Sequence, residues 1–169
     1  CGACENICPA HAVVMQYDQN GFMYPIINEN CINCGKCKSV CQVINPVNLY
    51  DSPDTYAVWN KNKEVRMASS SGGFFSIIAQ YVIDRSGVVF GVVYTDNFDG
   101  VYTACAKTMT EVAFMRGSKY VFCETREAFQ SARNYLENGN YVLYTGTPCE
   151  IAGLISYLGK NYEKLITCD

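Results

Sequence analysis

Seven cysteines near the start of the chain are spaced for iron–sulfur chemistry. They fall into two runs, a complete C-x2-C-x2-C-x3-C run of Cys31, Cys34, Cys37 and Cys41 and a copy of its last three positions, Cys1, Cys4 and Cys8. In such a run the first three thiolates bind one cubane, and the fourth points away to the other cluster. The spacing therefore predicts crossed ligation, in which Cys8 completes the cluster of the second run and Cys41 completes that of the first.

The cluster of Cys1, Cys4 and Cys41 has three of its four expected ligands in this sequence. The repeat places the fourth three residues before Cys1, and the sequence begins with cysteine rather than methionine. We therefore expect the sequence to be a fragment of a longer protein.

Disulfides and zinc are the two alternatives for so many cysteines. The total of 11 is odd, and the spacings match a cluster run rather than a disulfide framework. Zinc sites use two separated pairs, whereas four cysteines here share one short run. The pattern favours clusters over both alternatives, and it predicts a reducing, cytoplasmic compartment.

Composition excludes two classes of partner. Lys and Arg number 13 against 16 Asp and Glu, a formal charge of −3, and no basic run is long enough to follow a phosphate backbone. The longest uncharged apolar stretch, residues 67–83, is interrupted by serines, glycines and a glutamine. We expect neither nucleic-acid binding nor an integral membrane segment.

Two domains are expected from the distribution of residue types. Residues 1–48 hold the cluster cysteines and an expected hairpin, in which apolar segments 13–17 and 22–27 flank an Asn-Gly turn. This pattern predicts a small α+β ferredoxin-like two-cluster module that the clusters hold together. A linker at residues 49–54 and an α/β domain with a mixed sheet at residues 55–169 follow.

The α/β domain is expected from alternating strand and helix patterns. Strands are predicted at residues 56–59, 88–94, 101–106, 141–144 and 165–167. Helical spacing of apolar residues begins at Phe74, Ala128 and Ile151. Gly87, Gly139 and Gly159 stand where helix ends need a left-handed residue.

Two glycine-containing segments of this domain could bind an anionic group. The first, residues 69–73 (Ser-Ser-Ser-Gly-Gly, here the Ser-Gly turn), precedes the helix at Phe74, so free backbone N–H groups would gather there. A plain helix cap explains it equally well. The second, residues 116–120 (Arg-Gly-Ser-Lys-Tyr, here the basic loop), could hold an acidic cofactor or substrate, although exposed basic loops are common.

The segment at residues 146–149 (Gly-Thr-Pro-Cys, here the Thr-Pro-Cys turn) starts another helix. Thr147 at N-cap, Pro148 at N1 and Glu150 at N3 form a capping box. Cys149 then lies at N2, where a helix N-terminus stabilises a thiolate, so it is a candidate catalytic or redox residue. The alternative is a small buried residue in a tight turn.

Other reactive residues give little signal. His11, the single histidine, lies near an expected cluster and could tune its potential, but an ordinary surface histidine is the simpler interpretation. Cys105, Cys123 and Cys168 receive no role.

Together these motifs resemble the beta-subunit family of the deazaflavin (coenzyme F420) hydrogenases and dehydrogenases. The resemblance rests on the cysteine runs, the Ser-Gly turn with Phe74, the basic loop and the Thr-Pro-Cys turn, and it continues from Gly153-Leu154 to residues 165–167. Relatives include a formate dehydrogenase beta subunit and reductases of chlorophyll intermediates. Three departures stand out: Gln42 replaces the proline that usually follows the fourth cysteine, Phe122-Cys123 replaces the usual Gln-Ser, and Glu150 replaces Gln.

The resemblance implies an iron–sulfur flavoprotein oxidoreductase. Two 4Fe-4S clusters would relay single electrons to or from FAD, which exchanges hydride with a small-molecule donor or acceptor, and a redox partner protein or ferredoxin would take part. Cofactor contacts are implied for the three segments, at Ser70, Ser71, Gly72, Gly73, Arg116, Gly117, Ser118, Lys119, Gly146, Thr147, Pro148 and Cys149. Two rival readings remain, a non-catalytic ferredoxin-type electron-transfer subunit and a zinc-stabilised interaction module.

Overall fold

A mixed five-stranded sheet forms the centre of the larger part of the chain. The computed structural model describes residues 1–46 and 54–169. The strands are β3 (Val88–Tyr94), β4 (Val101–Ala106), β5 (Cys123–Glu124), β6 (Val142–Thr145) and β7 (Leu165–Cys168), in the order β5-β4-β3-β6-β7. The β3–β4 pair is antiparallel, and the pairs β3–β6, β4–β5 and β6–β7 are parallel. The expected mixed sheet with residues 88–94 at its centre is confirmed.

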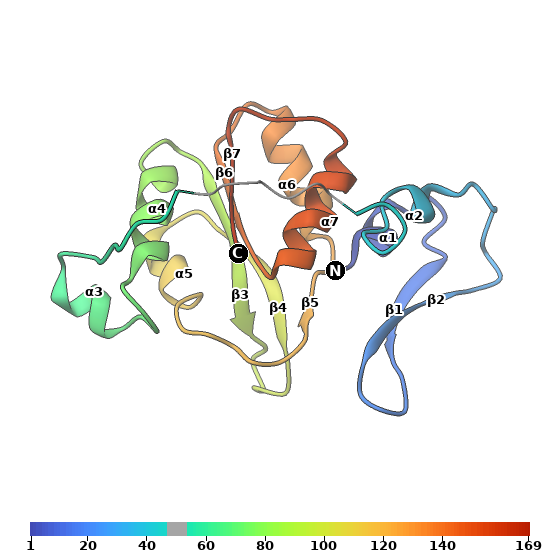
Figure 1. The fold of residues 1–169 in the computed structure, drawn as a ribbon, viewed down its shortest axis with the longest axis horizontal. Helices are drawn as coiled ribbons and strands as arrows, with labels where there is room; N and C mark the ends of the chain where they lie inside the picture. The colour runs from blue at the N-terminus through green and yellow to red at the C-terminus, as the bar shows by residue number, and fades with distance from the viewer. Residues whose placement is uncertain (47–53) are drawn as a thin grey trace.

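Helices cover both faces of this sheet. The helices of this part are α3 (Lys63–Met67), which lies away from the sheet (Figure 1), α4 (Phe74–Ile83), α5 (Met109–Ala113), α6 (Ala128–Glu137) and α7 (Pro148–Leu158). Helices α4 and α5 lie on one face and α6 and α7 on the other (Figure 1). None of the helices in the described ranges is both long and apolar enough to cross a bilayer.

Alternating side chains along the central strands build two separate cores. Val88 and Phe90 of β3 face α6 and α7, whereas Val89 faces α4 and α5. On β6, Tyr144 joins the first core and Leu143 the second. This alternation follows from the two-residue period of a strand whose faces are both covered.

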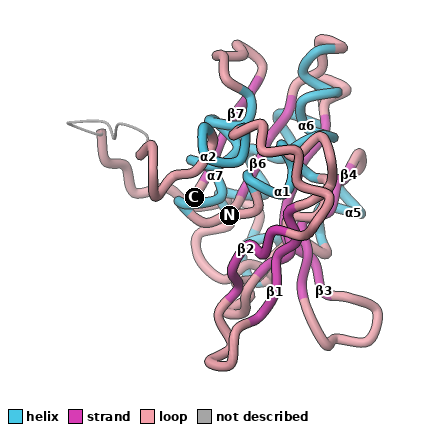
Figure 2. The backbone as a smooth tube through the Cα atoms, turned by 90° about the vertical axis from the view of Figure 1, so that its right-hand side faces the viewer, coloured by secondary structure: helices cyan, strands magenta, loops and turns pink. Residues whose placement is uncertain are grey.

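The cysteine-rich part is a ferredoxin-like module around a two-stranded sheet. Its elements are α1 (Ala3–Ile7), β1 (Val13–Tyr17), β2 (Met23–Ile27) and α2 (Lys36–Ser39). Strands β1 and β2 run antiparallel and side by side (Figure 2), joined by a turn in which Gly21 has a φ of 82°. The hairpin expected from the Asn-Gly signal is confirmed.

Two local predictions are wrong. Residues 56–59 form no strand, because they lie exposed and brace the Ser-Gly turn instead of joining the sheet. Gly87 is not left-handed; Ser86 takes that conformation, with a φ of 55°. Glycine is needed at 87 because a Cβ there would stand 2.5 Å from the carbonyl oxygen of Tyr141. The expected linker, residues 49–54, lies outside the described residues except for Asp54.

Candidate functional site

The Ser-Gly turn and the basic loop meet at the start of α4. The Ser118 hydroxyl donates to the Ser70 hydroxyl over 3.2 Å, and Nε of Arg116 donates to Oγ of Ser76 over 3.0 Å. Ser76 is buried in the first turn of α4, 4% exposed. Two segments more than 40 residues apart in sequence are therefore joined at one helix N-terminus.

Close backbone packing holds the Ser-Gly turn in shape. The Asn60 N–H donates to the Gly72 carbonyl oxygen over 2.6 Å, and a Cβ on Gly72 would stand 2.5 Å from the carbonyl oxygen of Val58. Gly73, the N-cap residue of α4, has a φ of 75° and supplies no side chain to cap the helix. The first N–H groups of α4 therefore have no side-chain acceptor at the N-cap, as an anion site requires.

Lys119 has a role inside the loop. Its ammonium group donates to the carbonyl oxygens of Met115, Arg116 and Gly117, over 3.2, 3.1 and 3.1 Å. Partial burial lowers the pKa of this ammonium below its ordinary value. Lys119 thus shapes the loop, and Arg116 is the loop's cation at the start of α4.

A cleft opens beside Arg116. It has a volume of about 470 Å³ and is lined by residues of α4, of α5, of the segments that directly follow these two helices, and of the segment before and within α3, among them Asn60, Ser76, Gln80, Arg85 and Arg116. Its wall carries two guanidinium groups, amides and hydroxyls together with the carboxylate of Asp84, which suits a polar ligand.

The Thr-Pro-Cys turn has the capping geometry that the sequence predicts. The Glu150 carboxylate accepts from the Thr147 N–H over 2.7 Å and from the Thr147 hydroxyl over 2.9 Å. Cys149 is exposed, with its Sγ 3.2 Å from the Thr147 hydroxyl oxygen. The box is confirmed, and the alternative of a buried Cys149 is wrong.

All three segments lie at the same end of the sheet. The Thr-Pro-Cys turn follows β6, and the strand β3 ends parallel to it, beside the start of α4. Ligands of α/β proteins commonly bind outside the carboxyl ends of the strands. However, α4 and α7 cover opposite faces of the sheet (Figure 1), and no hydrogen bond among the described residues joins the Thr-Pro-Cys turn to the other two segments.

The two cysteine runs have the same local geometry. Gly2 and Gly35 both adopt the left-handed conformation, with φ of 70° and 74°, and both are N-cap residues of a short helix that carries the next cysteine. In each run the chain therefore turns sharply between two cysteines, which a loop wrapping a cubane requires.

Backbone N–H groups surround the Cys8 sulfur. The Ala12 N–H donates to Cys8 Sγ over 3.2 Å. Partial burial raises the pKa of the Cys8 thiol, but N–H groups of residues 10–13 lower it by more, so it lies below its ordinary value. A thiolate is the form that binds iron, so this environment fits a cluster ligand.

The donor geometry differs from that of a single-ion site. Zinc needs about four side chains on one ion, whereas a cubane takes one thiolate per iron. Within residues 1–46 and 54–169, no three Cys, His, Asp or Glu side chains converge as ligands of one ion.

Comparison with known protein families decides between these interpretations. Residues 1–44 match the model described as "4Fe-4S dicluster domain", and residues 55–130 match "Coenzyme F420 hydrogenase/dehydrogenase, beta subunit N-term". The chain contains a 4Fe-4S dicluster domain followed by a coenzyme F420 hydrogenase/dehydrogenase beta-subunit N-terminal domain. No curated protein matches it.

This assignment confirms the coarse function. A dicluster domain carries two 4Fe-4S clusters, so the chain is an iron–sulfur electron-transfer protein of an oxidoreductase family. The Ser-Gly turn and the basic loop both lie within the region matched to the beta subunit, and the Thr-Pro-Cys turn lies beyond it.

Sequence reasoning missed Ser76 and Asn60, which position the two joined segments. Ser76 had a detectable signal, because it is the one polar residue in the apolar stretch 74–79 and falls on a buried position of α4. Asn60 had none, because its contact with Gly72 depends on how the exposed segment before α3 folds back.

His11 lines a second cleft, which lies between the two domains. The cleft has a volume of about 470 Å³ and lies between the cluster module and the segment around β5, with Glu5, Met15, Phe122 and Arg126 also in its wall. His11 has a φ of 49°, directly after the Cys8 loop. Its expected influence on a cluster stays a prediction.

Cys123 is predicted to resist alkylation. Burial raises the pKa of its thiol to about 11, and its Sγ lies 3.4 Å from the Thr103 hydroxyl oxygen. Because the thiolate is the reactive form, iodoacetamide should label Cys123 slowly at pH 8, with a rate that keeps rising as the pH approaches about 11. Exposed Cys149 should label first. Peptide mass spectrometry checks this order, and equal labelling of both thiols at pH 8 would contradict it.

Proposed function

We propose that this chain passes electrons between its two clusters and a flavin bound in the α/β domain. In this account the clusters carry single electrons, and bound FAD supplies the conversion between hydride and single electrons. The proposal rests above all on the joining of the Ser-Gly turn and the basic loop at the start of α4. Either segment alone is a weak signal, and together they form a cationic site.

The proposed cluster ligands follow the crossed pattern. Cys8, Cys31, Cys34 and Cys37 would hold one cluster, and Cys1, Cys4 and Cys41 would provide three ligands of the other. Support comes from the N–H groups around Cys8 and from the matched glycine turns at Gly2 and Gly35. Domain boundaries at residues 48 and 55 are part of the same proposal.

The proposed flavin contacts are assigned by charge. The free N–H groups at the start of α4 and the Arg116 guanidinium would bind the phosphates, since both favour anions. Ser70, Ser71, Gly72, Gly73, Gly117 and Ser118 would form the wall around them, and Lys119 would keep the loop in shape. Gly146, Thr147, Pro148 and Cys149 would border the site from the α7 side, with Cys149 as the candidate redox residue.

The family description suggests the partners. A hydrogenase or dehydrogenase beta subunit exchanges electrons with other proteins, so a redox partner protein or ferredoxin is proposed at the cluster end. A small-molecule hydride donor or acceptor is proposed at the flavin end, and the departure at Phe122-Cys123 leaves open whether it is a deazaflavin.

Titration with FAD tests the proposal. The visible spectrum of FAD is expected to shift on binding to the cluster-loaded chain, and Gly72→Asp should abolish the shift. The new side chain would meet the Val58 carbonyl and add a negative charge beside the phosphates. Asn20→Asp adds the same charge at the exposed tip of the β1–β2 hairpin and should bind FAD like the unchanged chain. If FAD shows no shift and Gly72→Asp leaves electron transfer unchanged, the chain is a ferredoxin-type carrier instead.

A further inference from the structure

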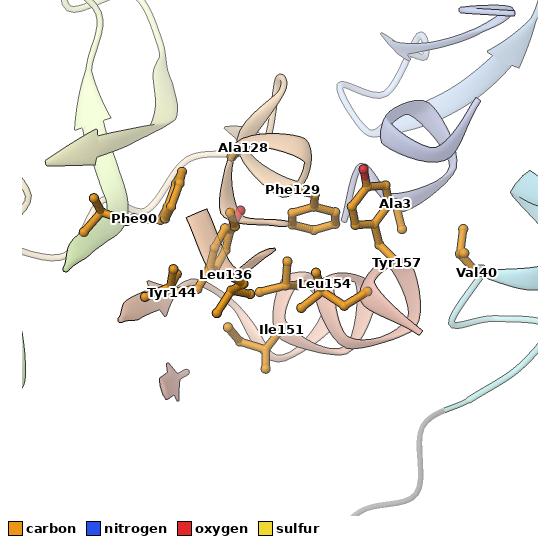
Figure 3. Close-up of a cluster of buried hydrophobic side chains, with 14 residues drawn as sticks. Ala3, Val40, Phe90, Ala128, Phe129, Leu136, Tyr144, Ile151, Leu154 and Tyr157 are labelled. Carbon is orange, nitrogen blue, oxygen red and sulfur yellow. The ribbon is translucent and has the colours of Figure 1, made fainter. Parts of the chain in front are cut away.

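The cluster module is fixed to the α/β domain by hydrogen bonds and by a shared core. Nδ2 of Asn6 donates to the Arg126 carbonyl oxygen over 2.8 Å, and Nε2 of Gln130 donates to the Asn6 carbonyl oxygen over 3.0 Å. Ala3 and Val40 of the module lie in the core of α6 and α7 (Figure 3). Because apolar and polar contacts both cross this boundary, one orientation of the module is favoured.

Gln42 forms the most direct link to α7. Its Nε2 donates to the Ala152 carbonyl oxygen over 2.8 Å and to the Ser156 hydroxyl over 2.7 Å. Gln42 directly follows Cys41, at the position where such a run usually carries proline. Proline has no side-chain donor, so this link is specific to chains that replace it.

The cysteines beside Gln42 belong to one of the two proposed clusters. A Cβ on Gly153 of α7 would stand 3.3 Å from Cys1 Sγ, so the Cys1 side chain packs on the helix. Ala3 and Val40, which directly precede Cys4 and Cys41, are buried in the same core as Leu154 and Leu158 of α7. Cys1, Cys4 and Cys41 therefore lie together at the α7 side of the module.

The other proposed cluster lies toward solvent. Residues 28–36, which carry Cys31 and Cys34, are exposed except for half-buried Cys31. In addition, Cys149 of the Thr-Pro-Cys turn precedes Gly153 by four residues on α7, so both residues are on the same helix face. The place where Cys1 packs on α7 is thus about one helical turn from Cys149 and the Thr-Pro-Cys turn, a segment of the proposed flavin site.

We propose that Gln42 is a positioning residue that holds the Cys1, Cys4 and Cys41 side of the module against α7. This cluster, rather than that of Cys8, Cys31, Cys34 and Cys37, then exchanges electrons with the α/β domain. Each exchange moves one electron, oxidising one 4Fe-4S cluster and reducing the acceptor, with no bond made or broken. The exchange of electrons rests on the proposed function, but the placement of the cluster does not.

Amide NMR spectra of the cluster-loaded chain, oxidised and then reduced with dithionite in the absence of flavin, test the placement. Unpaired electrons of a reduced cluster broaden nearby amide signals, and the effect falls steeply with distance. Signals of residues 152–156 are expected to broaden on reduction, whereas those of α4 keep their width. Cys34→Ser, which disturbs the outer cluster, should leave the broadening at residues 152–156 in place.

Gln42→Ala is expected to lose most of that broadening while keeping the iron content of the unchanged chain. Gln16→Ala removes an exposed glutamine of β1 and should behave like the unchanged chain. No broadening at residues 152–156, or its loss in Cys34→Ser with the inner cluster intact, would overturn the cluster order. Undiminished broadening in Gln42→Ala would overturn the role of Gln42. Because no flavin is present, these outcomes are independent of whether FAD binds.

Discussion

Removing iron from the reconstituted chain is expected to unfold residues 1–46 and to leave the five-stranded sheet folded. The module has little apolar core of its own. In the described residues its buried hydrophobic side chains are Ala3, Ala12, Val13 and Val40, and hairpin residues such as Tyr24 and Ile27 are exposed. A chain segment this small needs bound metal, disulfides or a similar cross-link to remain folded.

The larger domain does not share this dependence. Phe90, Phe129, Tyr144 and Leu154 are fully or almost fully buried around the sheet. Burial of each such side chain contributes about 1.5–3 kcal/mol, so the sheet retains its stability without the clusters. Loss of Ala3 and Val40 from the shared core should expose only the outer side of α6 and α7.

Hydrogen exchange measured under anaerobic conditions checks this result. With a chelator, amides of β1 and β2 should exchange at least about 100-fold faster, which corresponds to ~2.7 kcal/mol of lost local stability. Amides of β3 and β6 serve as the internal control and should remain protected. Protected hairpin amides in iron-free protein would show that the clusters do not hold the module together.

Arg116→Ala is expected to weaken FAD binding by about 10-fold to 100-fold. Hydrogen bonds to charged groups contribute about 1.5–3 kcal/mol, and Arg116 is the cation that Ser76 holds at the start of α4. Arg116→Lys keeps the positive charge but loses the planar guanidinium with its paired N–H donors. Its affinity for FAD should therefore lie between that of the unchanged chain and that of Arg116→Ala.

Equilibrium titration of FAD into each variant provides the measurement. Arg126→Ala is the matched control, because this arginine stacks on the Tyr102 ring, with its guanidinium carbon 3.9 Å from the ring centroid, and contacts Glu124 instead of α4. Equal affinities for Arg116→Ala and the unchanged chain would place the flavin elsewhere.

The sequence predicted the long elements well and the short ones poorly. Residues 88–94 and 101–106 carry continuous strand patterns, and the helices from Phe74 and Ala128 show clear helical spacing. Helices α3 and α5 each have five residues, too few for a helical period to be recognised. Residues 56–59 look like a strand because they are apolar and aromatic, yet no strand in the described part of the chain pairs with them.

The site could be predicted segment by segment but not as an assembly. The capping box at Thr147 and Glu150 is local, so its residues alone determine it. The contact between Ser70 and Ser118 depends instead on the path of the chain through β4 and α5. Gln42 appeared only as a departure from a motif, because its partners on α7 are about 110 residues away.

Stepwise anaerobic reduction of the cluster-loaded chain, first mixed with FAD and then passed through gel filtration to remove unbound flavin, tests the central claim most directly. Each cubane takes up one electron and a flavin takes up two, so the account predicts about four electrons per chain. Flavin absorbance should bleach in the same titration in which the cluster absorbance falls. Uptake of about two electrons, by protein that leaves the column without FAD, would contradict the account and identify a two-cluster carrier without a flavin.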